Sequence, residues 1–108
     1  MLEIYPVIIA FVRSLRPSIH GIERRDGDLA RQLRRAAASV ALNVAEGYGS
    51  GGGNRRLRYF TALGSMRETM ACLDVAEALG YLPGVDAAIV AQSNHILGTL
   101  VRLTQRRE

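Results

Sequence analysis

Residues 32–47 read QLRRAAASVALNVAEG, and this stretch carries the clearest structural pattern in the chain. Its apolar positions recur at steps of three or four, which is the spacing of one buried helix face. That row begins slightly upstream and comprises Leu29, Leu33, Ala36 or Ala37, Val40 and Val44. A second row, Ser39, Asn43 and Glu46, also steps by four and three and shares a different face. The stretch therefore predicts an amphipathic helix with a polar line beside its apolar face.

That polar line suits a hydrogen-bonded network or an interface better than open solvent, because small alanines beside it permit close approach of another helix. Arg35 lies four residues before Ser39 and extends the line, whereas Arg35 and Glu46 are too far apart to pair within one helix. Each of them is expected to pair with another helix or another subunit. The candidate structural or interface residues are Arg35, Ser39, Asn43, Glu46 and Gly47.

Upstream of this helix, Asp26 or Asp28 is a suitable N-cap, since a short acidic side chain accepts from the first backbone N–H groups. An earlier helix is predicted to start near Pro6. Pro17 lies inside its apolar pattern, and a proline there removes a backbone donor and crowds the preceding turn. We therefore expect a kink or break near residues 13–16.

Downstream, the helix is predicted to end at Gly47, because five of the eight residues from 47 to 54 are glycine. Asn54 is the expected N-cap of a third helix that closes at Gly80. A fourth helix is expected from about Val85 to Arg102 or beyond. It carries a second apolar line, Val90, Leu97 and Val101, which we interpret as a self-association surface.

These segments predict one all-α domain over residues 1–108, an up-down four-helix bundle. Aromatic residues make up only 6% of the chain, so the core must use aliphatic side chains and alanine. Such a small core favours burial of further surface against another copy. The apolar run near the N-terminus is too short to span a membrane and no signal peptide is visible, so a cytoplasmic location is expected.

The formal charge is +4, and all 14 basic residues are arginine. Arginine grips phosphate oxygens with a planar fork, although a GC-rich coding bias would also produce this composition. Arg55, Arg56 and Arg58 directly follow the glycine-rich stretch, where a helix N-terminus would add its unpaired N–H groups. Residues 54–58 are therefore either a phosphate-backbone site or a solvated surface segment. The nucleic-acid-binding candidates are Arg24, Arg25, Arg31, Arg34, Arg55, Arg56 and Arg58.

Other chemistry finds little support in the residues. The single Cys72 reads as a buried apolar group, and the isolated His20 and His95 predict no metal site. Gly47, Gly49 and Gly52 fit G-x-G-x-x-G, but no strand precedes them, so no nucleotide or other cofactor is expected. Arg13 and His20 loosely resemble the motif of HEPN helical ribonucleases. We otherwise expect no catalytic residues and no enzymatic activity.

The motif from Gln32 to Gly47 resembles the 23S rRNA-intervening-sequence proteins, a family of four-helix bundles. The resemblance continues at Phe60, at Gly64-Ser65-x-x-Glu68 and at Leu79-Gly80-Tyr81, and covers most of the chain. This family is similar to the accessory variability determinant proteins of diversity-generating retroelements, which are barrel-shaped homopentamers. The resemblance implies a homopentameric barrel but no reaction.

Three functions follow as expectations. The first is a homo-oligomeric scaffold that binds RNA or DNA through its arginine surfaces. The second is a scaffold for protein partners alone, for example a reverse transcriptase, which the resemblance implies for the related retroelement proteins. The third is a HEPN-like ribonuclease that uses Arg13 and His20.

Overall fold

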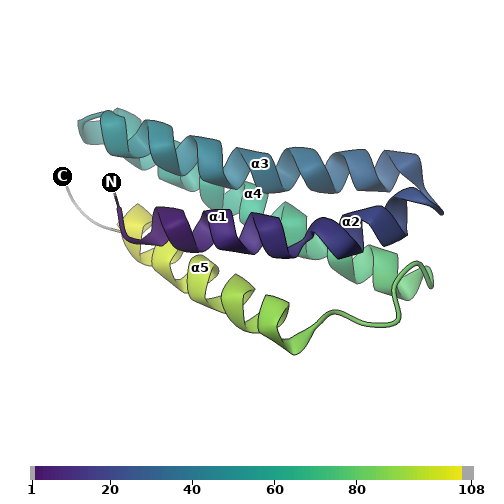
Figure 1. The fold of residues 1–108 in the computed structure, drawn as a ribbon. Helices are drawn as coiled ribbons and strands as arrows, with labels where there is room; N and C mark the ends of the chain where they lie inside the picture. The colour runs from purple at the N-terminus through teal and green to yellow at the C-terminus, as the bar shows by residue number, and fades with distance from the viewer. Residues whose placement is uncertain (1, 106–108) are drawn as a thin grey trace.

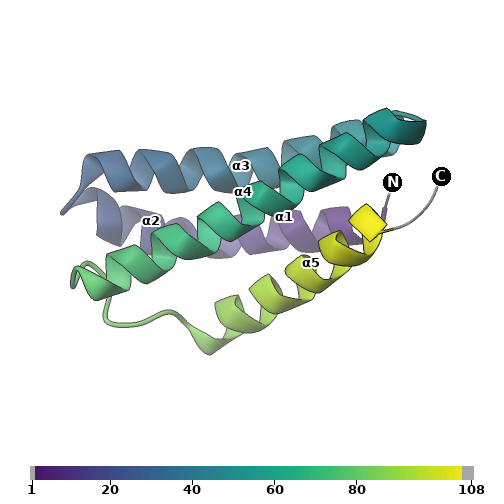
Figure 2. The ribbon, with the colours of Figure 1, turned by 180° about the vertical axis from the view of Figure 1, so that it is seen from behind.

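The computed structural model describes residues 2–105. They form α1 (Ile4–Ser14), α2 (Arg16–Glu23), α3 (Gly27–Gly49), α4 (Gly52–Ala78) and α5 (Ala87–Gln105). Helices α1 and α2 follow one line, so the chain runs up and down the long axis as a four-helix bundle (Figures 1 and 2). The described residues contain no strand, and the predicted all-α bundle is confirmed.

The break between α1 and α2 lies at Leu15, inside the range predicted from Pro17. Pro17 occupies the first turn of α2, where its missing N–H costs nothing. Leu15 itself is fully buried, with 0% of its surface exposed. The break therefore interrupts the helix while the apolar row continues across it into the core.

Two helix ends lie where the sequence predicted them. Asp26 is the N-cap of α3, and its carboxylate accepts a 3.0 Å hydrogen bond from the Leu29 N–H. At the end of α4, Gly80 adopts a φ of +78°, and the Tyr81 N–H donates back to the Ala76 carbonyl at 2.8 Å. The left-handed glycine and the hydrogen bond from residue 81 back to residue 76 together form a Schellman motif, which ends the helix.

The glycine-rich stretch differs from the prediction. Helix α3 does not end at Gly47 but continues to Gly49, and α4 starts at Gly52 with Gly51 as its N-cap, so Asn54 is not a cap. A positive φ of +57° at Gly52 lets the chain reverse within a very short turn. Helix α3 extends into the glycines because the Arg55 side chain of α4 donates hydrogen bonds to the carbonyl oxygens of Gly47 and Ser50 at its end.

The core lies between the helices, with α3 packed on α4, α4 on α5, and α1 on both α3 and α5. Within the described residues α1 and α4 make almost no direct contact, so they occupy opposite corners of the bundle. The fully buried centre is mostly aliphatic, and its larger members are Ile8, Phe11, Leu15, Ile22, Leu33, Met66, Ile96 and Leu100.

The second apolar line of the last helix is more buried than the sequence predicted. Leu97 and Val101 are partly buried against the core, and only Val90 is exposed, at 43%. The more exposed apolar side chains lie instead on α3 and on α4, where Leu42 and Leu57 are 63% and 61% exposed. Unpartnered apolar surface therefore belongs mainly to the α3–α4 hairpin.

Candidate nucleic-acid interface

The polar line of α3 faces α4 and is joined to it by hydrogen bonds. The hydroxyls of Ser39 and Ser65 lie 2.7 Å apart, and the Asn43 amide donates to the Ser39 hydroxyl at 3.0 Å. Glu46 forms an ion pair with Arg58 of α4, with 2.9 Å between their oxygen and nitrogen atoms. These residues fasten two helices of the same chain, so their spacing has a structural explanation within the fold.

Gly47 allows the closest approach between α3 and α4. A Cβ atom built on Gly47 would lie 2.5 Å from Cε1 and 2.9 Å from Cδ1 of Tyr59. The Tyr59 ring is buried, with 4% of its surface exposed, and it occupies the space that any larger residue would need. Gly47 is therefore required by packing, not by the helix end that the sequence suggested.

The arginines after the glycine-rich stretch, here called the turn cluster (Arg55, Arg56 and Arg58), make contacts within the chain. The Arg55 Nε donates to the carbonyl oxygens of Gly47 at 3.1 Å and Ser50 at 2.8 Å. The Arg56 Nε donates to the Thr104 carbonyl at 2.9 Å, and its guanidinium lies over the Phe60 ring. A side-chain cation thus caps the C-terminal end of α3 and another ties α4 to α5.

A second group lies at the opposite end of the bundle and is here called the α2–α3 patch (Arg24, Arg25, Arg31 and Arg34). All four side chains are exposed. Arg31 pairs with Asp28, at 65% and 92% side-chain exposure, and Arg34 pairs with Glu23. Arg25 lies over the Tyr81 ring, whereas Arg24 has no ion-pair partner within residues 2–105. These contacts are exchangeable, because exposed ion pairs contribute only about 0–1 kcal/mol.

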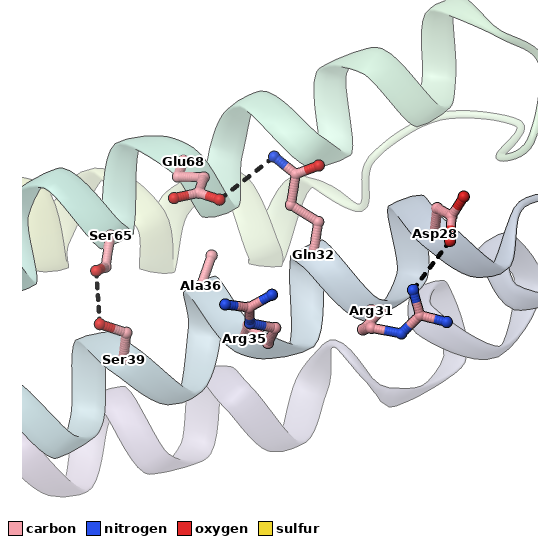
Figure 3. A pocket seen from close by; sticks show the side chains of 8 residues that line it. All are labelled: Asp28, Arg31, Gln32, Arg35, Ala36, Ser39, Ser65 and Glu68. Atoms are coloured by element: carbon pink, nitrogen blue, oxygen red, sulfur yellow. Dashed lines mark hydrogen bonds and ion pairs between the residues drawn. The ribbon is translucent and has the colours of Figure 1, made fainter.

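A polar groove of about 680 Å³ continues from this patch along the seam between α3 and α4. Figure 3 shows Arg31 and Arg35 on the α3 side, and Gln32 reaching across to Glu68 of α4. Ser39 and Ser65 line the end of the groove away from Asp28 and Arg31 (Figure 3). Arg35 is exposed and forms no ion pair among the described residues, which leaves its guanidinium available beside the patch.

Two titratable groups respond to their surroundings. The hydrogen bond and positive charge of Arg34 lower the pKa of Glu23 below its ordinary 4.5. The charged ion pair at the patch therefore persists into mildly acidic conditions. Burial, with a smaller contribution from the Glu68 charge, raises the pKa of the Cys72 thiol. Cys72 is thus an inert packed group rather than a reactive one.

The two residues that resemble the HEPN ribonuclease motif lie on separate helices. Arg13 is in α1 and His20 in α2, on either side of the break, and both are exposed. Within residues 2–105, no group of three or more His, Cys, Asp or Glu side chains is arranged to hold a metal ion. None of the helices in that range is both long and apolar enough to cross a bilayer.

A sequence model for the 23S rRNA-intervening sequence protein family matches residues 4–101, nearly the whole chain. The chain belongs to this family. No curated protein and no solved structure matches it. In this 23S rRNA-intervening sequence protein, residues 32–47 form the part of α3 whose Ser39 and Glu46 side chains are joined to α4.

In this 23S rRNA-intervening sequence protein the seven arginine candidates fall into two groups. The structure gathers Arg24, Arg25, Arg31 and Arg34 at one end, while the turn cluster lies at the other (Figure 1). Sequence reasoning placed Arg35 with the interface motif and not with the nucleic-acid candidates. Its four-residue step from Arg31 is the pattern that would have joined the two on one helix face.

Proposed function

We propose that this protein is a non-enzymatic scaffold that assembles into a homopentameric barrel and binds nucleic acid through the α2–α3 patch. Arg35, in the adjoining groove, extends the proposed surface. The proposed location is the cytoplasm. The proposal narrows the seven sequence candidates to the four at the α2–α3 end.

The observation that carries the proposal is the difference in how the arginines are held. In the α2–α3 patch, Arg31 and Arg34 are exposed and hold only surface carboxylates. A phosphate can replace such a partner at little cost, because an exposed ion pair is weak and arginine binds phosphate with two parallel hydrogen bonds. Arg55 and Arg56 of the turn cluster would instead have to give up hydrogen bonds to backbone carbonyls.

Assembly would strengthen a weak single surface. Each copy carries one α2–α3 patch, and a ring presents several of them to one polyanion, which raises the effective concentration of each further contact. The exposed Leu42 and Leu57 side chains support self-association, because a contact between copies would remove their apolar surface from water.

The test measures binding of labelled single-stranded RNA and duplex DNA by fluorescence anisotropy at low and moderate salt, with the mass of the protein followed by light scattering. We expect an assembled species whose affinity falls steeply with salt, since released counterions dominate phosphate binding. A protein that binds neither nucleic acid at low salt would contradict the proposal.

A second function, a scaffold for protein partners alone, is favoured by the mixed lining of the groove. Gln32, Ser39, Ser65 and Glu68 offer donors and acceptors beside Arg35, which suits a peptide or protein surface as well as a phosphate. Partner capture that survives removal of the patch arginines would favour this function. Shortened RNA after long incubation, abolished by His20→Ala, would favour a ribonuclease.

A further inference from the structure

A small pocket lies between the C-terminal part of α4 and the start of α5. Its volume is about 280 Å³, and its apolar lining comes from both helices and the segment between them: Met70, Leu73, Val85 and Val90. Pockets for drug-sized ligands measure about 300–1,000 Å³, so this one lies just below that range. It therefore suits a single long side chain or a small molecule rather than a whole helix.

The polar side chains in the lining of this pocket are all hydrogen-bond acceptors. Asp74 and Glu77 contribute carboxylates from α4, and Ser93 contributes a hydroxyl from α5. Ser93 is 2% exposed, and its hydroxyl donates to the Ile89 carbonyl at 2.8 Å, so its oxygen is left only to accept. A ligand that fits this lining is a hydrogen-bond donor with a positive charge and an apolar part.

The pocket lies in the acidic part of an otherwise basic chain. Residues 68–101 contain four acidic residues and no arginine or lysine, whereas the whole chain carries +4. Of these four, Glu68 and Asp86 accept hydrogen bonds within the chain. Asp74 and Glu77 are exposed and form no ion pair among the described residues. The two carboxylates that line the pocket therefore remain available to a cation from outside the chain.

The position of these carboxylates is unfavourable for the helix that carries them. Glu77 lies in the last turn of α4 and Asp74 one turn earlier, and the last turn holds no basic residue. A helix C-terminus carries a partial negative charge, so an acidic side chain there is destabilising. Neutral side chains would serve the fold better, whereas a bound cation gives both charges a use.

We propose that this pocket binds one arginine or lysine side chain of a protein partner. The aliphatic stem lies against the apolar lining, and the charged end meets the carboxylates of Asp74 and Glu77. A free amine fits the same chemistry, but exposed ion pairs are weak, and a protein segment adds contacts beside the pocket. The inference goes beyond the proposed function, because it concerns a face that binds cations rather than phosphates.

The test is an NMR titration of the ¹⁵N-labelled protein with a capped pentapeptide that has one arginine between two leucines. Backbone amide signals of pocket residues Gly84, Val90 and Ser93 should shift. The same peptide with citrulline in place of arginine keeps the shape but lacks the charge, and it should leave these signals unchanged. Equal shifts from both peptides would contradict recognition of a cation.

Two variants of equal charge locate the site. Asp74→Asn/Glu77→Gln should bind the arginine peptide about tenfold more weakly, because neutral hydrogen bonds replace charge-assisted ones. It should also melt at or slightly above the wild-type temperature, since the helix loses two unfavourable charges. Glu3→Gln/Asp28→Asn, which neutralises two exposed carboxylates elsewhere, should keep the wild-type affinity.

Three results would overturn the proposal. Equal loss of binding in both double variants would mean general attraction of the peptide to the protein and no site at the pocket. A clear fall in the melting temperature of Asp74→Asn/Glu77→Gln would give the two carboxylates a structural role instead. Agmatine, which carries the guanidinium on a free aliphatic chain, should bind more weakly than the peptide, and equal affinity would reject a protein partner as the source of the cation.

Discussion

Arginine clusters lie at both ends of the bundle, and the protein holds them in different ways. In the turn cluster, Arg55 donates to two backbone carbonyls at the end of α3, and Arg56 donates to a carbonyl in α5. In the α2–α3 patch, Arg31 and Arg34 reach only exposed carboxylates. Arg55 and Arg56 thus supply hydrogen bonds to backbone carbonyls, and Arg58 holds the exposed Glu46 carboxylate. Arg31 and Arg34 can exchange their exposed partners for a ligand at little cost.

The comparison shows that the density of basic residues along the sequence is a poor guide to which arginines are available for binding. Residues 47–60 hold three arginines and no acidic residue, which makes them the most basic stretch outside the terminus. Yet the glycine-rich turn beside them exposes carbonyls that need donors, and Arg55 supplies these. The α2–α3 patch has a nearly balanced charge, but its cations are the more accessible ones.

The largest expected effect comes from a substitution at the close α3–α4 contact beside the turn cluster. Gly47→Ala places a methyl group 2.5 Å from Cε1 of the Tyr59 ring, well inside van der Waals contact, and should lower the free energy of unfolding by about 2–3 kcal/mol. Urea unfolding followed by circular dichroism measures it. Gly49→Ala is the matched control, because its added Cβ meets nothing within 4 Å, and it should be neutral or slightly stabilising. Equal stability of both variants would show that the Tyr59 contact does not constrain Gly47.

A smaller loss of stability should distinguish an arginine of the turn cluster from an arginine of the α2–α3 patch. Arg55→Gln leaves the Gly47 and Ser50 carbonyls without their charged donor and should cost about 1–2 kcal/mol of unfolding free energy. Arg31→Gln loses only an exposed ion pair and should cost less than about 0.5 kcal/mol. Thermal unfolding of the two variants gives the difference. A larger loss for Arg31→Gln would reverse the assignment of roles.

The smallest effect concerns the ion pair in the patch. Because Arg34 lowers the pKa of Glu23, the pair stabilises the fold near neutral pH, and this contribution disappears as the pH falls from 4.5 through the folded-state pKa. Arg34→Gln should return the Glu23 pKa toward 4.5. Carboxyl chemical shifts in an NMR titration measure the change, and an unaltered Glu23 pKa would mean that the two side chains do not interact in solution.

Features set by neighbouring residues could be predicted from the sequence, and features set by distant side chains could not. The Asp26 cap, the break before Pro17 and the Gly80 stop each depend on a few adjacent residues. The end of α3 depends on Arg55, which acts from the next helix. The polar line of Ser39, Asn43 and Glu46 was visible, but its partners in α4 emerged only when the two helices were placed together.

The salt dependence of nucleic-acid binding in two equally charged variants tests the division between the clusters most directly. Arg24→Gln/Arg31→Gln/Arg34→Gln should lose most of its affinity, and the slope of log affinity against log salt should shrink by about 2–3. Arg55→Gln/Arg56→Gln/Arg58→Gln, measured below its lowered melting temperature, should keep the wild-type slope. A slope that shrinks in the second variant and not in the first would contradict the assignment of the α2–α3 patch as the phosphate-binding surface.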